Sequence, residues 1–253
     1  MDYQVFSRFD VFIIHAMNSL AGRSVLFDKA VAFLMGNSLS TALLLAVFWA
    51  CWFRPADTAA LQRTREHLLG TLWAGIAGIV IARTLALKLP FRLRPRFDPS
   101  IHFVIPGLSD SSDIMEWSAF PSDHAVMYLA LSVGLVFVSR KLGLLATLYV
   151  ACTICFPRVY LGYHYATDIL VGMVIGSLCA YAFNLTAARR WLAVPVLRWE
   201  RLSPQIFYMA LFFLTFQYAT MFDSLRESAM SLYHVAEKLL AYATAGSALL
   251  AMQ

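Results

Sequence analysis

Residues 158–168 read Arg-Val-Tyr-Leu-Gly-Tyr-His-Tyr-Ala-Thr-Asp, and they lie at the start of an apolar segment. His164 and Asp168 are four residues apart, so on a helix they would share one face. A carboxylate in that position can fix the tautomer of an imidazole and stabilise its protonated form. Arg158 can hold an oxyanion through two parallel hydrogen bonds. The stretch is therefore a candidate catalytic motif, and the alternative is a surface salt bridge at the end of a membrane helix.

Two further polar stretches accompany the first. Residues 121–124 read Pro-Ser-Asp-His, and residues 88–96 contain, among prolines, the basic residues Lys88, Arg92, Arg94 and Arg96. Helices that cross a membrane in alternating directions would place all three stretches on one membrane face. We therefore expect them to form one site.

The composition is that of an integral membrane protein. The 253 residues are 60% hydrophobic and 14% charged, whereas soluble domains are about 45–50% apolar and about 25% charged. The net charge of +5 lies largely in short loops. The sequence has no basic stripe on a soluble face, so it does not indicate nucleic-acid binding.

Apolar runs predict an all-α, polytopic membrane bundle with about six transmembrane helices, near residues 34–53, 68–87, 120–138, 142–156, 165–185 and 206–222. Small residues four apart, such as Gly172 and Gly176, predict close approach of neighbouring helices. Charged positions such as Asp10 and Asp28 interrupt the apolar pattern of residues 1–33, which suits interfacial amphipathic helices. We expect three parts: interfacial helices at 1–33, a membrane-embedded core at 34–203, and a C-terminal transmembrane helix and tail at 204–253. The tail from residue 223 is amphipathic, and the sequence assigns it no role.

The basic loops predict the orientation. The loops 54–67, 139–141 and 186–203 carry arginine or lysine and are expected on the cytoplasmic side. Both termini and the loops 88–118 and 157–164 then face outward, which means the periplasm if the membrane is an inner membrane. The basic cluster at 88–96 contradicts the charge rule on that side, so its cations are expected to have a function.

These residue types suit phosphoryl transfer without a metal or a cofactor. His164 can attack phosphorus and hold it covalently, and Asp168 would orient it. His124 can protonate the leaving oxygen and later take a proton from water. Ser122 and the main-chain N–H groups around Asp123 offer hydrogen bonds to an anion at a helix N-terminus. Fixed cations would neutralise the phosphate, and the candidates are Lys88, Arg94 and Arg158.

The three stretches together resemble the signature motifs of the type 2 phosphatidic acid phosphatase superfamily, the lipid phosphate phosphatases. The third motif, an arginine, five residues, a histidine, three residues and an aspartate, matches, although Pro157 stands where the family usually has serine. The second motif is usually Pro-Ser-Gly-His; here Asp123 replaces the glycine, as in undecaprenyl-pyrophosphate phosphatases. In the first motif five residues rather than six separate Lys88 from Arg94. Arg92 or Arg83 is therefore an alternative for that cation.

The resemblance implies a helical core, a metal-free phosphohistidine mechanism and a membrane-lipid substrate. We expect hydrolysis of undecaprenyl pyrophosphate to undecaprenyl phosphate and phosphate. Phosphatidic acid, phosphatidylglycerol phosphate and lipid A phosphates are the alternative substrates. The sequence does not decide the lipid headgroup or the oligomeric state.

Other interpretations stay open at this point. Lys88 at the end of a span is also typical of a lysine that reaches lipid headgroups. Aromatic residues suggest an interfacial belt or the lining of a path for a lipid tail: Tyr160, Tyr163 and Tyr165. Acidic residues suggest a lid over the basic site: Asp110, Asp113 and Glu116. Rival functions are a vanadate-dependent haloperoxidase, typically soluble, and a protein that binds or transports anionic lipids and needs the cations but not the histidines.

Overall fold

The computed structural model describes residues 8–106, 117–223, 225, 228 and 231. All regular elements in these residues are helical, which confirms the all-α prediction. The chain divides into two compact units, the first ending at Phe207 and the second beginning at Tyr208. The predicted lid residues 110–116 and almost all of the tail beyond residue 223 lie outside the described residues. The α-helices are α1 (Arg8–Asn18), α2 (Val25–Gly36), α3 (Leu39–Trp52), α4 (Thr58–Lys88), α5 (Asp123–Val136), α6 (Arg140–Val150), α7 (Phe156–Tyr160), α8 (Ala166–Asn184), α9 (Thr186–Leu202) and α10 (Pro204–Ala219).

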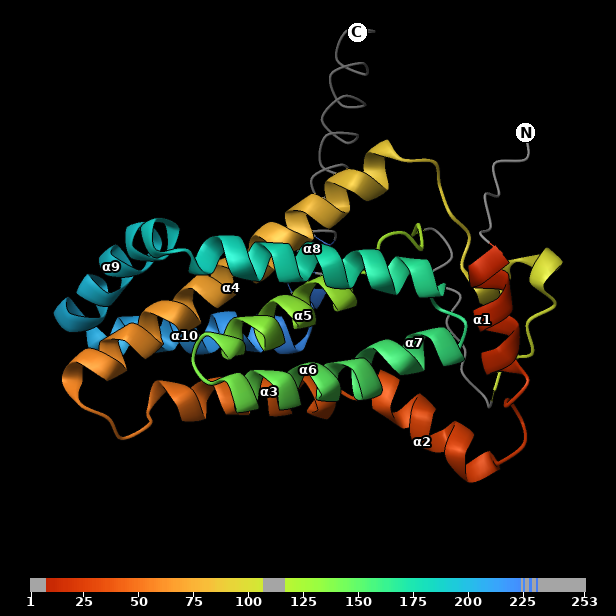
Figure 1. Cartoon of the computed structure of the whole chain (residues 1–253), viewed down its shortest axis with the longest axis horizontal. Helices are drawn as coiled ribbons and strands as arrows, with labels where there is room; N and C mark the ends of the chain where they lie inside the picture. Colours follow the sequence, from red (N-terminus) through yellow and green to blue (C-terminus); the bar gives the residue numbers. More distant parts are fainter. Residues whose placement is uncertain (1–7, 107–116, 224, 226–227, 229–230, 232–253) are drawn as a thin grey trace, which may run out of the picture. The chain divides into compact units, whose positions relative to one another are not determined.

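Helix α5 is the centre of the first unit and packs mainly against α8 and α4 (Figure 1). The closeness of these contacts depends on glycine. A Cβ added to Gly176 of α8 would lie 2.2 Å from the carbonyl oxygen of Val126, and one added to Gly78 of α4 would lie 2.7 Å from Cγ1 of the same residue. The predicted close packing at small residues is therefore confirmed, and it brings the starts of α5 and α8 together.

By length and composition, three continuous helices are candidate membrane spans: α4, the helix Arg140–Tyr160 and α8. The helix Arg140–Tyr160 joins α6 to α7 through a π-helical segment, Ala151–Cys155. Helices α2 and α3, bent by 54° at their junction, count as a fourth span if the pair crosses as one. The apolar α5 has 14 residues and reaches only about 21 Å at 1.5 Å per residue, less than the ~30 Å of a bilayer core. The described residues therefore give three or four candidate spans and do not establish six.

Two regions predicted as loops are helical. Helix α4 begins at Thr58, where the Asp57 side chain accepts a hydrogen bond from the N–H of Ala60 at 2.8 Å. Helix α9 occupies most of the predicted loop 186–203. Both predictions were wrong because they followed hydropathy. The two regions are rich in arginine, which lowers their hydropathy although arginine is a good helix former.

The two N-terminal helices turn acidic side chains toward the protein. Asp10 and Asp28 are 1% and 4% exposed, whereas Phe12 and Leu26 are 69% and 81% exposed. Helix α1 packs against α7 and α8, and α2 packs against α7. The basic residues of the same helices, such as Arg8 and Lys29, are exposed. Within the first unit these helices therefore contribute buried polar contacts as well as apolar surface.

The polar contacts of the first unit gather at its two ends. At one end α1 lies beside the start of α8 and the end of α7 (Figure 1). Helix α9 lies at the other end, where a second buried cluster joins α4, α8 and α9. There Asn184 Oδ1 lies 2.8 Å from His67 Nδ1, and Arg189 Nη1 lies 3.0 Å from His67 Nε2. His67, for which the sequence suggested no partner, therefore links three helices.

Candidate active site

Main-chain hydrogen bonds join the three predicted stretches at the end of the bundle that holds α1. The N–H of Ser122 donates to the carbonyl of Asp168 at 3.2 Å, and the N–H of Arg96 donates to the carbonyl of Gly162 at 3.0 Å. The N–H of Ala119 donates to the carbonyl of Arg92 at 2.8 Å. Segments far apart in the chain thus form one polar site.

His164 is buried, and a main-chain carbonyl orients its ring. Nδ1 lies 2.8 Å from the carbonyl oxygen of Ala119. Because that oxygen only accepts, Nδ1 carries the hydrogen and Nε2 has the lone pair. Nε2 faces Nη1 of Arg94 at 3.4 Å. The carboxylate of Asp168 lies farther from Nδ1, at 3.7 Å. This carboxylate therefore acts on the ring mainly through its charge.

The surroundings of His164 favour its neutral form. Burial lowers the pKa of this imidazole below its ordinary value. The positive charges of Arg94 and Arg158 lower the pKa further, against the opposing effect of Asp168. A neutral imidazole with its lone pair on Nε2 is the form that can attack an electrophile.

Arg94 and Arg158 bring positive charge to the same place. Arg94 Nη1 donates to the carbonyl of Tyr163 at 2.9 Å, and burial lowers its pKa to about 10, so it stays charged at neutral pH. Arg158 is 7% exposed, and its Nη1 donates to the carbonyl of Ile154 at 2.7 Å. Its own carbonyl accepts hydrogen bonds from the N–H groups of Tyr163 and His164. This fold-back after α7, with Gly162 at a φ of 72°, places the arginine and the histidine side by side.

The start of α5 contains an unsatisfied hydroxyl. Ser122 is fully buried, and its Oγ has no hydrogen-bond partner in the part of the chain that the structure describes. It occupies the position before the first helical residue but makes no side-chain cap. Buried hydroxyls without a partner are rare because they cost free energy. The adjacent His124 is half-buried beside Tyr128, with ring centroids 6.1 Å apart.

The three candidates for the first-motif cation have different surroundings. Arg83 of α4 pairs with the carboxylate of Asp123, and its guanidinium lies 4.9 Å from the ring centroid of Trp117. Lys88 is exposed in the last turn of α4. Arg92 is held by two carboxylates: Nη1 donates to Asp168 at 2.5 Å, and Nη2 donates to Asp10 at 2.6 Å.

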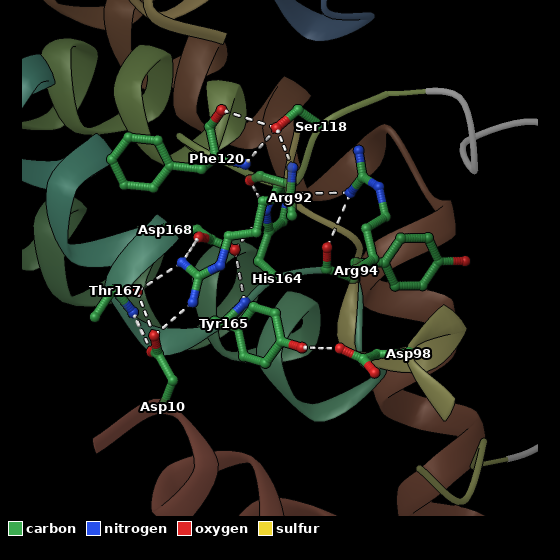
Figure 2. A network of polar contacts seen from close by, with 12 residues as sticks. Asp10, Arg92, Arg94, Asp98, Ser118, Phe120, His164, Tyr165, Thr167 and Asp168 are labelled. Carbon is green, nitrogen blue, oxygen red and sulfur yellow. Dashed lines mark hydrogen bonds and ion pairs between the residues drawn. The ribbon is translucent and has the colours of Figure 1, made fainter. Parts of the chain in front are cut away.

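Figure 2 shows Arg92 at the centre of a network that the sequence did not indicate. Its Nη1 also donates to the hydroxyl of Thr167 at 2.9 Å, and its guanidinium lies 4.3 Å from the ring centroid of Tyr165. The Tyr165 hydroxyl donates to Asp98 at 3.3 Å. The available signal in the sequence was an aspartate, Asp10, within the largely apolar helix Arg8–Asn18. Tyr165, predicted as part of an aromatic belt or of a path for a lipid tail, thus packs inside this network.

Metal ligands do not cluster at this site. Among the residues described, no group of three or more His, Cys, Asp or Glu side chains is arranged to hold a metal ion. The charges that surround His164 are arginines and one carboxylate.

Comparison with known proteins agrees with the motifs. Residues 68–192, which contain all three motifs, match the model of the PAP2 superfamily. Residues 68–192 form a PAP2 superfamily domain. This match confirms the resemblance found in the sequence. Together with the candidate membrane spans, the match identifies the chain as a membrane-bound phosphatase.

Two curated relatives cover similar parts of this PAP2 protein. The undecaprenyl-diphosphatase BcrC of Bacillus subtilis (strain 168) is 28% identical over 184 residues, 72% of this chain and 82% of that protein. The bacitracin transport permease protein BcrC of Bacillus licheniformis is 25% identical over 185 residues, 73% of this chain and 83% of that protein. No solved structure matches the chain significantly.

Proposed function

We propose that this protein hydrolyses the terminal phosphate of undecaprenyl pyrophosphate, giving undecaprenyl phosphate and inorganic phosphate, through a phosphohistidine on His164. The observation that carries the proposal is the unsatisfied, fully buried Oγ of Ser122 at the start of α5. The hydroxyl and the helix N-terminus offer donors to an anion. At the same end of the bundle, Arg94 faces Nε2 of His164 at 3.4 Å.

In the first step, Nε2 of His164 attacks the terminal phosphorus. A P–N bond forms and the P–O bond to the lipid phosphate breaks, while His124 gives a proton to the departing oxygen. The attacking imidazole becomes positively charged. Its Nδ1–H stays on the Ala119 carbonyl, and Asp168 at 3.7 Å stabilises the new charge. Arg94 and Arg158 neutralise the charge on the transferring phosphate.

In the second step, water attacks the phosphohistidine. His124, now deprotonated, takes a proton from that water, a P–O bond forms and the P–N bond breaks. Inorganic phosphate leaves and His164 returns to its neutral form. The two histidines therefore have separate roles in both steps, and the mechanism requires no metal.

The choice of lipid rests on two observations. A relative that is 28% identical over 72% of this chain is named an undecaprenyl-diphosphatase. In addition, Arg83 is a third cation near the site. Burial is the main cause of the lowered pKa of Arg94, and the positive charge of Arg83 lowers that pKa further. If Arg83 exchanges Asp123 for substrate, it supplies a contact for the second phosphate of a diphosphate. Lys88, exposed at the end of α4, is a further candidate for that contact.

We further propose that the protein lies in the cytoplasmic membrane with six spans and its active site on the outer face. The six spans would include the short α5 and α10. In support, the bundle end opposite the site carries the arginines of α9, as the charge rule requires of a cytoplasmic end.

The test is phosphate release by the purified protein, with EDTA present, from undecaprenyl pyrophosphate, phosphatidic acid and phosphatidylglycerol phosphate. We expect the diphosphate to be preferred, EDTA to have no effect, and His164→Ala to abolish release. His102→Asn is the matched control, because His102 is exposed near the same end and Asn tolerates its left-handed backbone at a φ of 49°. Rapid quenching with radiolabelled substrate should trap acid-labile label on the wild type and none on His164→Ala.

A second candidate is binding or transport of an anionic lipid without turnover, because a relative is named a transport permease. Release of phosphate from no lipid by folded protein, with lipid binding that survives His164→Ala, would favour that candidate.

A further inference from the structure

Asp10 of α1 is buried against the first turn of α8, although 157 residues separate it from Thr167. One oxygen, Oδ1, accepts the N–H of Thr167 at 2.9 Å. The other, Oδ2, accepts the hydroxyl of Thr167 at 2.6 Å and Nη2 of Arg92 at 2.6 Å. The N–H of Thr167 has no partner inside its own helix, because it belongs to the first turn. Asp10 therefore caps α8 from another helix.

The same carboxylate balances the charge of Arg92. Figure 2 shows Arg92 between Asp10 on one side and Asp168 on the other. Both ion pairs are short, at 2.6 Å and 2.5 Å. Burial raises the pKa of Asp10, but the hydrogen bonds from Thr167 and Arg92 outweigh it and leave the pKa below its ordinary value. Two negative charges thus surround one positive charge, and one net negative charge is left near His164.

Arg92 also holds His164 through its main chain. Its carbonyl accepts the N–H of Ala119 at 2.8 Å, and the carbonyl of Ala119 accepts Nδ1–H of His164. The N–H of Arg92 donates to the hydroxyl of Ser118 at 3.2 Å. A shift of Arg92 would therefore move both the carboxylate of Asp168 and the carbonyl that orients the ring.

We infer that Asp10 is a positioning residue of the phosphatase: through its ion pair with Arg92, it sets the place and the effective charge of Asp168 beside His164. This inference rests on the proposed function. It makes α1 part of the catalytic unit, a role that the interfacial-helix prediction did not include.

The effect on the reaction follows from the charges that face His164. These are Arg94, Arg158 and Asp168. Without the charge of Asp10, Arg92 neutralises Asp168, and the carboxylate no longer offsets the positive charge that develops on the phosphorylated imidazole. The chemical step should slow, whereas binding of the lipid phosphate, which the other arginines contact, should change little.

The test compares Asp10→Asn with Asp28→Asn. Asp28 is also a buried acid of the N-terminal helices; it accepts hydrogen bonds from the Tyr160 hydroxyl and from the N–H of Gly22, and none from Arg92. Both variants lose one buried charge. We expect Asp10→Asn to lower kcat by about 10- to 100-fold with KM within about twofold. The kcat of Asp28→Asn, per folded molecule, should stay close to that of the wild type.

A double-mutant cycle separates positioning from general stability. If Asp10 acts through Arg92, the pair Asp10→Asn/Arg92→Gln should lose no more kcat than Arg92→Gln alone. The inference is overturned if Asp10→Asn keeps the activity of Asp28→Asn, or if the losses from Asp10→Asn and Arg92→Gln multiply. Release of phosphate by neither the wild type nor Asp28→Asn would overturn the proposed function itself, and the inference with it. Release by both, at equal rates with Asp10→Asn, would overturn the inference alone.

Discussion

At the scale of single residues, one group orients the His164 ring and another supplies the negative charge beside it. The main-chain carbonyl of Ala119 holds His164 at 2.8 Å, whereas Asp168 stands at 3.7 Å with its own oxygens bound by Arg92 and by the N–H of Tyr165. A carboxylate held in this way can act on the imidazole through its charge without forming the nearest hydrogen bond.

The pH dependence should reflect this division. The pKa of His164 lies below its ordinary value of 6.5. The midpoint of the acid limb in the pH profile of kcat/KM should therefore lie below pH 6.5. Asp168→Asn removes the negative charge that favours the protonated ring, so the limb should move to still lower pH while kcat falls. A profile in which Asp168→Asn moves the limb upward would contradict the assignment.

Ser122 should contribute to activity but not to stability. Its buried hydroxyl has no partner among the described residues, so Ser122→Ala should leave the thermal midpoint in detergent unchanged or slightly higher. The activity should fall by about 10²- to 10³-fold if the hydroxyl contacts the transferring phosphate. Ser132→Ala is the control on the same helix, because Ser132 is equally buried but its hydroxyl donates to the Leu129 carbonyl. Equal activity of the two alanine variants would count against the phosphate contact.

At the scale of elements, the site depends on how closely α5 and α8 pack. Gly172 and Gly176 are points where a Cβ would meet the backbone of α5, at 2.8 Å from the carbonyl oxygen of Ser122 and 2.2 Å from that of Val126. The starts of these two helices carry the two histidine motifs. Any separation of the helices would therefore also separate the motifs.

Gly176→Ala should destabilise the fold by about 1–3 kcal/mol, because backbone atoms cannot move aside as a flexible side chain can. The measurement is thermal unfolding in detergent micelles. Gly36→Ala is the control, since nothing lies within 4 Å of a Cβ added there. It should be neutral or slightly stabilising. Equal midpoints for the two variants would show that the contact between α5 and α8 is looser than described.

At the scale of the whole chain, the first unit has a polar cluster at each end. The site lies at one end, and His67, Asn184 and Arg189 join helices at the other. In the orientation that we propose, the arginines of α9 lie at the cytoplasmic end, as the charge rule predicts. The predicted catalytic residues would then face the outer side of the membrane.

The orientation can be tested with a membrane-impermeant maleimide on intact cells, in a cysteine-free protein. The loop 157–164 is buried and makes a poor reporter, so the choice falls on exposed positions at the two ends: Ser100→Cys and Ala56→Cys. Ser100→Cys should react from outside, and Ala56→Cys only after the cells are opened. The reverse pattern would place the active site in the cytoplasm.

The sequence by itself determined the helical fold class and the resemblance to the family, and it predicted the site residues. Apolar runs report membrane helices because lipid cannot satisfy backbone polar groups, and the glycines of α8 indicated where the helices meet. The residues of the three motifs could be proposed as a site because the chemistry of phosphoryl transfer limits which side chains serve it. Hydropathy did not reveal α9 or the early start of α4, since arginine is compatible with a helix and with a loop alike.

Only the tertiary structure decided which atoms contact His164. The carbonyl of Ala119 and the carboxylate of Asp10 carry no motif: any residue supplies a carbonyl, and an aspartate in an amphipathic helix normally faces water. Their roles depend on the packing of α1 against α8 and of the Arg92 segment against residues 118–120. Spacing along the chain predicts neighbours within one helix, because the helical repeat is fixed. It does not predict contacts between residues 157 positions apart, which exist only once the helices have packed.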